Sequence, residues 1–407
     1  MKCRHCHHEL HLGFVDLGFS PPSNAYLLPA DLAAPEIHYP LRVKVCEQCW
    51  LVQTEDFARH DELFNAEYAY FSSTSTTWLA HARAYVEMIV PRLGLNSASR
   101  VVEIAANDGY LLQYVAERGI PCLGVEPTHR TAEAARAKGL RIDEIFLGAA
   151  SATALLARDG AADLIVANNV LAHVPDINDF VRGIGILLAP RGSATFEFPH
   201  LLNLIAQTQF DTIYHEHFSY LSLLTVERIL NQAGLCVYDV EQLPTHGGSL
   251  RVYAARPDAL FPVSPEVARV AAAERAAGLD QPAVYQQFQA RADAVRLGLQ
   301  AFLLEQKQLG KTVLAYGAAA KGNTLLNYAG IDALLLPQVA DAAPSKQGKY
   351  LPGSHIPIVT PQTLLAGKPD FVLILPWNLK HEVMQQLQVI RQWGGRFVVA
   401  VPEVEIL

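Results

Sequence analysis

Short apolar runs alternate with helical segments from Arg100 onward, and this alternation constrains the fold more than any other feature of the chain. Segments 111–118 and 131–138 have helical spacing. The runs between and after them read as buried strands: Val101–Ala105, Cys122–Glu126, Asp163–Ala167 and Ala194–Phe198. Strands that alternate with helices in this way predict a parallel sheet with helices on both faces.

A second α/β unit is predicted near the end of the chain. Its strand-like runs are Thr312–Tyr316, Phe371–Leu375 and Phe397–Val401. A helical connector precedes it, beginning at Ser264 as the N-cap and Pro265 in the first turn. One buried helical face of this connector is predicted from Val284, Phe288, Val295, Leu299 and Phe302.

The length of 407 residues suggests two to three domains. We expect an N-terminal module (1–60), a central α/β domain (61–256), the helical connector (257–308) and a C-terminal Rossmann-like domain (309–407). Residues 61–98 look helical, with apolar anchors at Tyr68, Phe71, Trp78 and Leu79.

Composition excludes several classes of partner. A net charge of −8 without a long basic run argues against nucleic acid. No apolar stretch reaches the roughly 18 residues of a membrane span, and the N-terminus has no signal-peptide core. We therefore expect a soluble, cytoplasmic protein of undetermined oligomeric state. Cys122 and Cys236 lie in apolar runs and are expected to be buried thiols.

The other four cysteines form two CxxC pairs, Cys3-x2-Cys6 and Cys46-x2-Cys49. Two such pairs can complete a tetrahedral shell of four thiolates, which leaves no open position and therefore predicts structural zinc. The loop between the pairs is longer than in a usual zinc ribbon. His5, His7, His8 and His11 are competing ligands, and four reduced cysteines without a metal are the alternative.

A cofactor pocket is predicted where the first two parallel strands end. The turn that runs from Glu103 to Tyr110 contains small residues, which allow close approach of a ligand. Glu126 ends the next strand, where a carboxylate can accept both hydroxyls of a ribose. The turn lacks the G-x-G-x-x-G pattern of a dinucleotide site, so a degenerate NAD site is less favoured than a phosphate-free cofactor such as S-adenosylmethionine. The candidate cofactor residues are Glu103, Ala105, Asn107, Asp108, Gly109, Glu126, Asn168 and Asn169.

Several uncommon motifs coincide with these features. They are Phe210–Tyr220 with its Tyr-His-Glu-His core, His246–Arg251, Gly317–Asn323 and Lys346–Gly353. Together with the CxxC pairs and the turn from Glu103, they resemble the sugar C-methyltransferase family along essentially the whole chain. Ala106 departs from the family, in which many members carry serine, and this change should leave the turn intact.

The resemblance implies a zinc module, a central class I methyltransferase domain and a C-terminal Rossmann-like domain. It also implies S-adenosylmethionine as methyl donor and a nucleotide-linked keto-deoxysugar, such as a dTDP sugar, methylated at C-3 beside a C-4 ketone. By this resemblance His217 is the base that forms an enolate. Tyr68, His173, Tyr214 and Glu216 match other positions of the family's pocket.

Substrate residues are expected in two places. His246 and Gly247 belong to the His-Gly-Gly motif, and Lys321 and Asn323 belong to a glycine turn whose amides suit a diphosphate. Asp341 ends a following strand and is a candidate for contacting the nucleoside.

Three alternatives stay open. The enzyme could methylate oxygen, or carbon of a non-sugar substrate, or the chain could be a non-catalytic zinc and nucleotide-sugar binding protein. Individual residues also have plainer explanations. His173 could cap a helix near Pro175, Tyr68 could be core packing, and Tyr214–His217 could be a packed loop.

Overall fold

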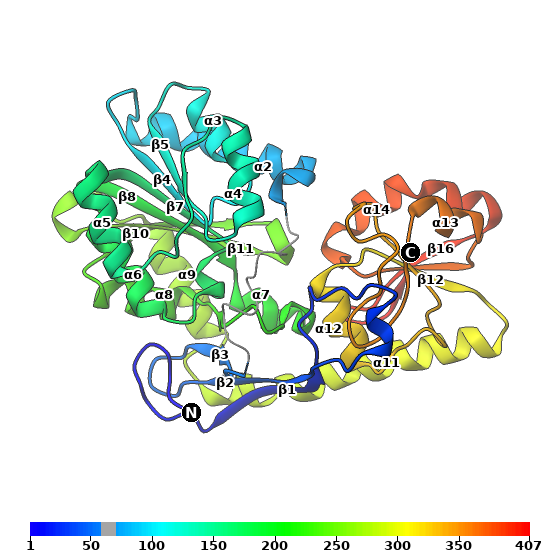
Figure 1. Cartoon of the computed structure of the whole chain (residues 1–407). Coiled ribbons are helices and arrows are strands. Elements are labelled where there is room, and N and C mark those ends of the chain that lie inside the picture. Colours follow the sequence, from blue (N-terminus) through cyan, green and yellow to red (C-terminus); the bar gives the residue numbers. More distant parts are fainter. Residues whose placement is uncertain (58–70) are drawn as a thin grey trace.

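The computed structural model describes residues 1–57 and 71–407 of the chain, which form three sheets. Figure 1 shows the central sheet and the C-terminal sheet as two lobes, with the N-terminal strands and the long helix α11 beneath them. Tyr68 lies outside the described residues. Among the described residues, no helix is long and apolar enough to cross a membrane.

The central sheet has seven strands in the order β10-β11-β8-β7-β4-β5-β6, of which β8 to β6 run parallel. Their bounds are β4 (Val101–Ile104), β5 (Cys122–Val125), β6 (Ile142–Asp143), β7 (Ala162–Asn168), β8 (Leu188–Pro199), β10 (Cys236–Leu243) and β11 (Ser249–Ala255). The chain winds outward from β4 to β6 and then returns to place β7 on the other side of β4. The carboxyl ends of β4 and β7 therefore form the switch point at which open α/β sheets bind ligands.

Helices cover both faces of this sheet, because its strands are apolar on both sides. One face packs against α2 (Thr76–Leu93), α3 (Leu112–Ala116) and α4 (His129–Ala137). The other packs against α5 (Ala149–Asp159), α6 (Ile177–Leu187), α8 (Leu223–Gln232) and α9 (Pro265–Ala276). The predicted doubly wound domain is thus confirmed, with strand and helix ends within a few residues of expectation.

The N-terminal sheet is antiparallel and has the order β1-β2-β3-β9. Its strands are β1 (Leu12–Ser20), β2 (Tyr39–Val45), β3 (Val52–Thr54) and β9 (Ser219–Tyr220). The last strand belongs to the central part of the chain and follows His217 by two residues. The Tyr-His-Glu-His loop is therefore attached directly to the N-terminal sheet.

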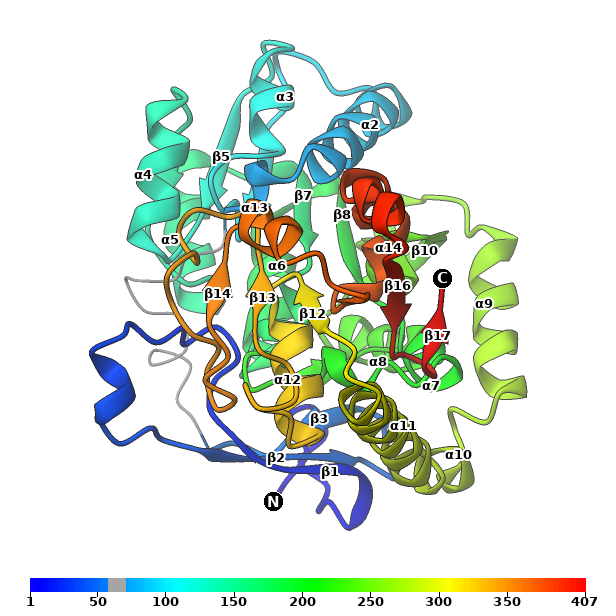
Figure 2. The same cartoon turned by 90° about the vertical axis from the view of Figure 1, so that its right-hand side faces the viewer.

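The C-terminal sheet has the order β14-β13-β12-β15-β16-β17 and is parallel except for β17. Its strands are β12 (Val313–Tyr316), β13 (Val339–Ala340), β14 (Ile358–Val359), β15 (Phe371–Ile374), β16 (Arg396–Val399) and β17 (Glu405–Ile406). Figure 2 shows this sheet with α12 (Ala320–Tyr328), α13 (Pro361–Ala366) and α14 (Lys380–Gln386). Its own switch point lies between the carboxyl ends of β12 and β15.

The connector contains a break that the sequence analysis did not predict. Helix α10 (Pro282–Gln286) ends before α11 (Phe288–Gln308) begins, so Val284 belongs to a separate short helix. The buried face of α11 is confirmed at Phe288, Val295, Leu299 and Phe302. Phe288 stacks on Phe14 of β1, with ring centroids 4.2 Å apart. One hydrophobic core thereby joins the N-terminal sheet, the connector and the C-terminal sheet.

The prediction that both remaining cysteines are buried is wrong for Cys236. It is the first residue of β10, which is an edge strand of the central sheet, and its side chain is exposed. Cys122, at the start of the inner strand β5, is partly buried.

Candidate functional site

The four paired cysteines converge at one end of the N-terminal sheet. The Sγ atoms of Cys3 and Cys49 are 3.5 Å apart, those of Cys6 and Cys46 are 3.4 Å apart, and all four lie within 4.8 Å of one another. Four sulfurs about 2.3 Å from a central zinc are about 3.8 Å from each other. The cluster therefore has nearly the dimensions of a tetrahedral zinc site with four thiolates.

No histidine belongs to this cluster among the described residues. His5, which lies nearest in sequence, directs Nδ1 to Oδ1 of Asn178 at 2.8 Å instead. Gln53 donates from Nε2 to Sγ of Cys3 at 3.3 Å, a contact that stabilises thiolate charge. The cysteine set is thus preferred over the histidine alternative.

The cofactor turn follows β4 and is held by Glu126 at the end of β5. The amides of Asn107 and Thr128 both donate to the Glu126 carboxylate, at 2.8 Å and 2.9 Å. Gly109 has φ of 75°, and a Cβ there would lie 2.2 Å from the Leu140 side chain. Only glycine fits this position, which explains its place in the motif. Ala105 and Asn107 also have positive φ, at 56° and 50°.

Buried polar atoms gather beside this turn. The carboxylate oxygens of Glu103 and the amide oxygens of Asn168 and Asn169 have no partner at good hydrogen-bond geometry among the described residues, although the Tyr110 hydroxyl lies near Glu103 and Asn168. Burial, together with the charges of Glu126 and Asp108, raises the pKa of Glu103 well above its usual value. Unpartnered polar atoms are costly in a folded protein, so the switch point of β4 and β7 fits a polar ligand such as S-adenosylmethionine.

Asp108 instead interacts with other segments of the protein. Its carboxylate accepts bonds from the Ser73 amide at 3.3 Å and lies 3.5 Å from Nζ of Lys138. It therefore joins the chain before α2 to the cofactor turn.

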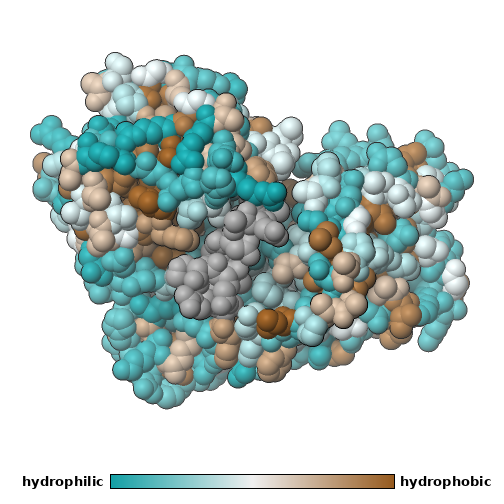
Figure 3. Space-filling model, in the orientation of Figure 1, coloured by the Kyte–Doolittle hydropathy of each residue, from teal (hydrophilic) through white to brown (hydrophobic). Residues whose placement is uncertain are grey.

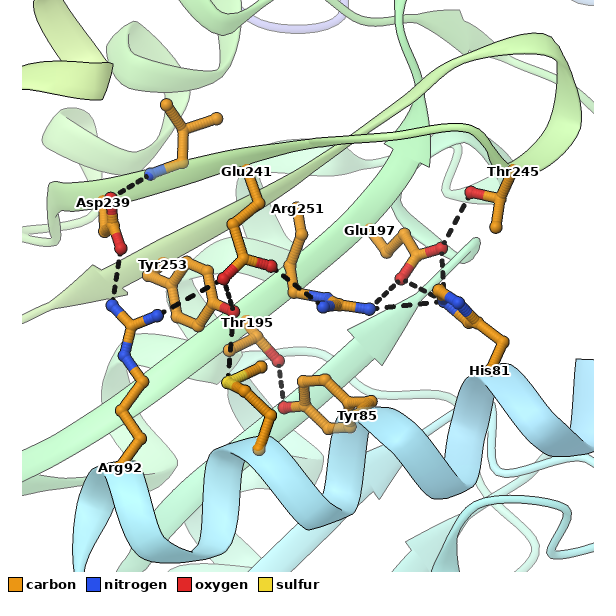
Figure 4. A network of polar contacts seen from close by, with 12 residues as sticks. His81, Tyr85, Arg92, Thr195, Glu197, Asp239, Glu241, Thr245, Arg251 and Tyr253 are labelled. Carbon is orange, nitrogen blue, oxygen red and sulfur yellow. Dashed lines mark hydrogen bonds and ion pairs between the residues drawn. The ribbon is translucent and has the colours of Figure 1, made fainter.

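A polar network fixes α2 over the same edge of the sheet (Figure 4). Glu197 on β8 is fully buried, and it accepts bonds from His81 at 3.0 Å and from Arg251 at 2.9 Å. The ring of Trp78, one turn before His81, lies 5.2 Å from His246 and 5.9 Å from Tyr110. The sequence analysis missed Glu197 and His81, although a carboxylate within the apolar run Ala194–Phe198 was a signal for a buried ion pair.

His217 lies at the centre of the Tyr-His-Glu-His loop. Its Nδ1 is 2.8 Å from the carbonyl oxygen of Thr212. A carbonyl only accepts, so Nδ1 carries the proton and Nε2 keeps its lone pair. Burial, followed by the proximity of His173, lowers the pKa of His217 well below its usual value. The ring packs on Tyr214 at 3.9 Å and edge-on against His173 at 4.6 Å.

The neighbours of His217 are held in different directions. His173 directs Nδ1 to the backbone oxygen of Glu216 at 2.7 Å, and burial lowers its pKa to about 4. The predicted alternative that His173 caps a helix is wrong, because Asp176 is the N-cap of α6. His215 points to the N-terminal sheet, where its Nε2 lies 3.3 Å from the oxygen of Pro40. Burial raises the pKa of Glu216 to about 7, and a hydrogen bond from Asn24 opposes this rise.

Lys321 meets this group from the switch point of the C-terminal sheet. Its Nζ lies 4.7 Å from the Trp377 ring and donates to Asn378 at 3.2 Å. Trp377 in turn donates to Asp211, one residue before the loop's Thr212, at 2.7 Å. Burial, followed by the charge of Lys321, lowers the pKa of His246 to about 4, and the same charge contributes at His217. Lys321 of the C-terminal sheet therefore lies near enough to His246 and His217 for its charge to act on both rings.

The remaining substrate candidates occupy different surroundings. Asn323 is buried and donates to the Ser23 oxygen at 2.6 Å. Asp341 accepts from the amides of Ala318 and Ala343, both at 2.8 Å, and so supports the glycine turn. Gly247 has φ of 88°, and a Cβ there would lie 2.5 Å from the Trp377 ring. Trp377 and Asp211 are functional candidates that the sequence analysis missed, since no local pattern connects residues 166 positions apart.

Comparisons with known proteins cover the chain from end to end. Family models match a zinc-binding domain at residues 3–64, a methyltransferase domain at 78–240 and a C-methyltransferase C-terminal domain at 244–402. The C-methyltransferase NovU of Streptomyces niveus is 36% identical over 406 residues, which are 100% of this chain and 96% of that protein.

Two solved structures resemble less than half of the chain each. Magnesium protoporphyrin IX methyltransferase from Synechocystis PCC 6803, with bound SAH, is 16% identical and covers 44% of this chain and 82% of its own, with a TM-score of 0.35. The YcgJ protein from Bacillus subtilis is 14% identical and covers 44% of this chain and 98% of its own, with a TM-score of 0.36.

The predicted fold class, zinc-binding module and methyl donor are confirmed by the sheets, the cysteine cluster and the family models together. With 36% identity to a C-methyltransferase over its full length, the chain belongs to the C-methyltransferase family and is an S-adenosylmethionine-dependent methyltransferase.

Proposed function

We propose that this enzyme methylates the carbon beside a ketone in a nucleotide-linked sugar, C-3 next to a C-4 ketone of a dTDP sugar, with His217 as the base. The observation that carries the proposal is the bond from Nδ1 of His217 to the Thr212 oxygen at 2.8 Å. It leaves Nε2 unprotonated, with a lone pair that can accept a proton. The sugar, its nucleotide and the C-3 position come from the family resemblance.

The proposed reaction needs a carbon nucleophile. Nε2 of His217 takes the proton from the carbon, and the electrons of that C–H bond move to form an enolate with its charge on the ketone oxygen. S-adenosylmethionine, when bound, supplies a methyl group on a sulfonium sulfur that leaves as a neutral thioether. The role of the chain is then to hold the enolate carbon in line with that methyl group.

The hydrogen bonds around the loop indicate which residues donate to the enolate oxygen and which bind the sugar. His173 also donates from Nδ1 to a carbonyl, so its Nε2 is an acceptor and cannot donate to the enolate oxygen in this neutral form. We therefore assign that donation to the Tyr214 hydroxyl. Glu216 does not orient His217 through its carboxylate, whose partner is Asn24, and we assign Glu216 to a sugar hydroxyl.

We propose that the parts of the chain divide this work as the sequence predicts. Residues 1–60 bind zinc, 61–256 bind the methyl donor and carry the base, 257–308 connect, and 309–407 hold the nucleotide. In the cytoplasm the four thiols stay reduced, which suits zinc binding.

Mass spectrometry with a panel of nucleotide-linked 4-keto sugars and S-adenosylmethionine tests the proposed function. We expect one methyl group on carbon next to the ketone. Methyl transfer to a hydroxyl oxygen, or turnover only with substrates that lack a nucleotide, would contradict the proposal.

Replacing Glu126 with alanine should weaken binding of S-adenosylhomocysteine by about 1–3 kcal/mol, the size of lost charge-assisted hydrogen bonds. The carboxylate holds the Asn107 amide, and we assign it to accept the ribose hydroxyls. Calorimetry measures the affinity, and Glu133→Ala on the exposed side of α4 is the control. Equal affinity of both variants would show that the ribose binds elsewhere.

Replacing Lys321 with alanine should raise KM for the nucleotide-linked substrate about 10- to 100-fold, since one charge-assisted contact to phosphate is lost. Affinity for S-adenosylhomocysteine should not change, because Lys321 lies at the other switch point. Lys311→Ala, an exposed lysine of the same lobe paired with Asp370, is the matched control for steady-state kinetics. If Lys321→Ala instead weakened S-adenosylhomocysteine binding, the cofactor site and the nucleotide site would have been assigned to the wrong α/β domains.

A further inference from the structure

A segment of the N-terminal module, Ser23 to Tyr26, lies between the Tyr-His-Glu-His loop and the C-terminal lobe. Asn24 donates from Nδ2 to Oε2 of Glu216 at 2.6 Å, across 192 residues of sequence. The residues on either side bind the C-terminal lobe. Ser23 accepts from Asn323 at 2.6 Å, and the Tyr26 hydroxyl donates to the Ala318 oxygen at 2.6 Å.

Local backbone bonds make this segment rigid. The Ala25 amide donates to the Pro22 oxygen and the Tyr26 amide to the Asn24 oxygen, both at 3.0 Å, so Asn24 sits in a tight turn. A further pair of backbone bonds joins Leu27 to Tyr350, at 3.0 Å and 2.9 Å. With its turn fixed and both flanks anchored, the Asn24 amide has little freedom to leave Glu216.

The carboxylate that Asn24 contacts is almost fully buried, at 2% exposure. A carboxylate can only accept, so the amide nitrogen is the atom that faces it, and a bond of this kind stabilises the ionised form. We infer that Asn24 is a positioning residue, supplied by the zinc-binding module, that fixes the orientation of the Glu216 carboxyl group and favours its ionised form. The inference rests on the proposed part of Glu216 in binding the substrate.

The surroundings of Glu216 make its titration simple to interpret. Tyr26 and His173 are titratable residues that interact with Glu216, and His217 follows it in the chain. Both histidines have lowered pKa values and are neutral near pH 7, and Tyr26 has a raised pKa and is neutral as well. The acid limb of the rate profile is therefore expected from Glu216 rather than from the base.

Two causes set the pKa of Glu216, and they determine the direction in which the Asn24→Ala change moves it. Burial raises the pKa of Glu216 to about 7 and the Asn24 bond opposes this rise. Without that bond the carboxyl should hold its proton to higher pH, by about one unit, the size given by one hydrogen bond to a charged group. Near pH 7 the active, ionised fraction should then fall several-fold.

The test uses the full-length enzyme with glutamate labelled with ¹³C at the side-chain carboxyl, titrated by NMR without substrate. Glu216→Gln assigns the resonance. We expect Asn24→Ala to raise the titration midpoint of Glu216 by about one unit. Tyr26→Phe is the matched control, because it removes a neighbouring anchor and leaves the Asn24 bond in place. A midpoint unchanged in Asn24→Ala, or shifted equally in Tyr26→Phe, would overturn the inference.

The rate profile separates this inference from the proposed function. With a dTDP-linked 4-keto-6-deoxy sugar, the acid limb of kcat/KM should move upward in Asn24→Ala by the same interval as the NMR midpoint. An NMR shift without a shift in the acid limb would overturn the role of Asn24 in the reaction. If wild-type enzyme transferred no methyl group to any keto sugar, the proposed function would fail, and the NMR midpoint would still decide the Asn24–Glu216 contact.

Discussion

Replacing His217 with alanine should slow methyl transfer by about 10²–10⁴-fold, the usual contribution of a general base. Binding of S-adenosylhomocysteine should be nearly normal, because His217 belongs to the loop before β9 and not to the turn after β4. The expected loss is large because the imidazole is already neutral, oriented by Thr212 and packed between aromatic rings. Single-turnover kinetics with saturating methyl donor measure the effect.

His215→Ala is the control for this prediction. His215 lies on the same loop, but it points to the Pro40 oxygen on the N-terminal side. His173→Ala is the sharper comparison, since its ring has the same tautomer and lies 4.6 Å away. If His173→Ala slowed methyl transfer by the expected factor and His217→Ala had only a mild effect, His173 and not His217 would be the base.

Replacing Cys49 with serine should leave much less than one zinc per chain and lower the melting temperature of the N-terminal module. A structural zinc site contributes about 10 kcal/mol or more to folding, so the loss of one thiolate from a closed shell is severe. Cys49 is buried in the core shared with the central domain. Elemental analysis and differential scanning calorimetry measure the two effects, and Cys236→Ser, at an exposed thiol outside the cluster, is the control.

The zinc variant should also reduce methyl transfer, although none of the four cysteines belongs to the Tyr-His-Glu-His loop. Strand β3 pairs with β9, and the Thr54 hydroxyl donates to the His217 oxygen at 3.3 Å. Disorder of the N-terminal module should therefore disturb His217, which bonds to Thr54 through its carbonyl oxygen and lies two residues before β9. Full zinc occupancy in Cys49→Ser, or an unaltered melting profile, would contradict the assignment of the metal site.

Much of the fold could be predicted from local pattern. The strands β4, β7 and β8 contain mainly apolar runs, and the CxxC spacing identified all four cysteines of the cluster. The pattern failed where neighbours decide the outcome. Cys236 is exposed because its strand lies at the sheet edge, which an apolar run cannot reveal.

The site was harder to predict, because its parts meet only in three dimensions. Trp377 reaches Asp211, and Asn24 reaches Glu216, across more than 160 residues each. The two lobes stand next to each other in the space-filling view of Figure 3. Trp377 and Asp211 come from different lobes, whereas Asn24 comes from the N-terminal segment. The motifs alone predicted which residue types the Tyr-His-Glu-His loop contains. The packing of the lobes and of the N-terminal segment determines which side chains that loop contacts.

Deuterium at the carbon beside the ketone gives the most direct test of the central claim. A dTDP-linked 4-keto sugar carrying deuterium in place of the hydrogen at C-3 is methylated by the wild-type enzyme, and the product is analysed by mass spectrometry. The account predicts that the product contains the new methyl group and no deuterium at C-3, because the base must remove that atom before the carbon can attack. A methylated product that retains the deuterium would contradict it.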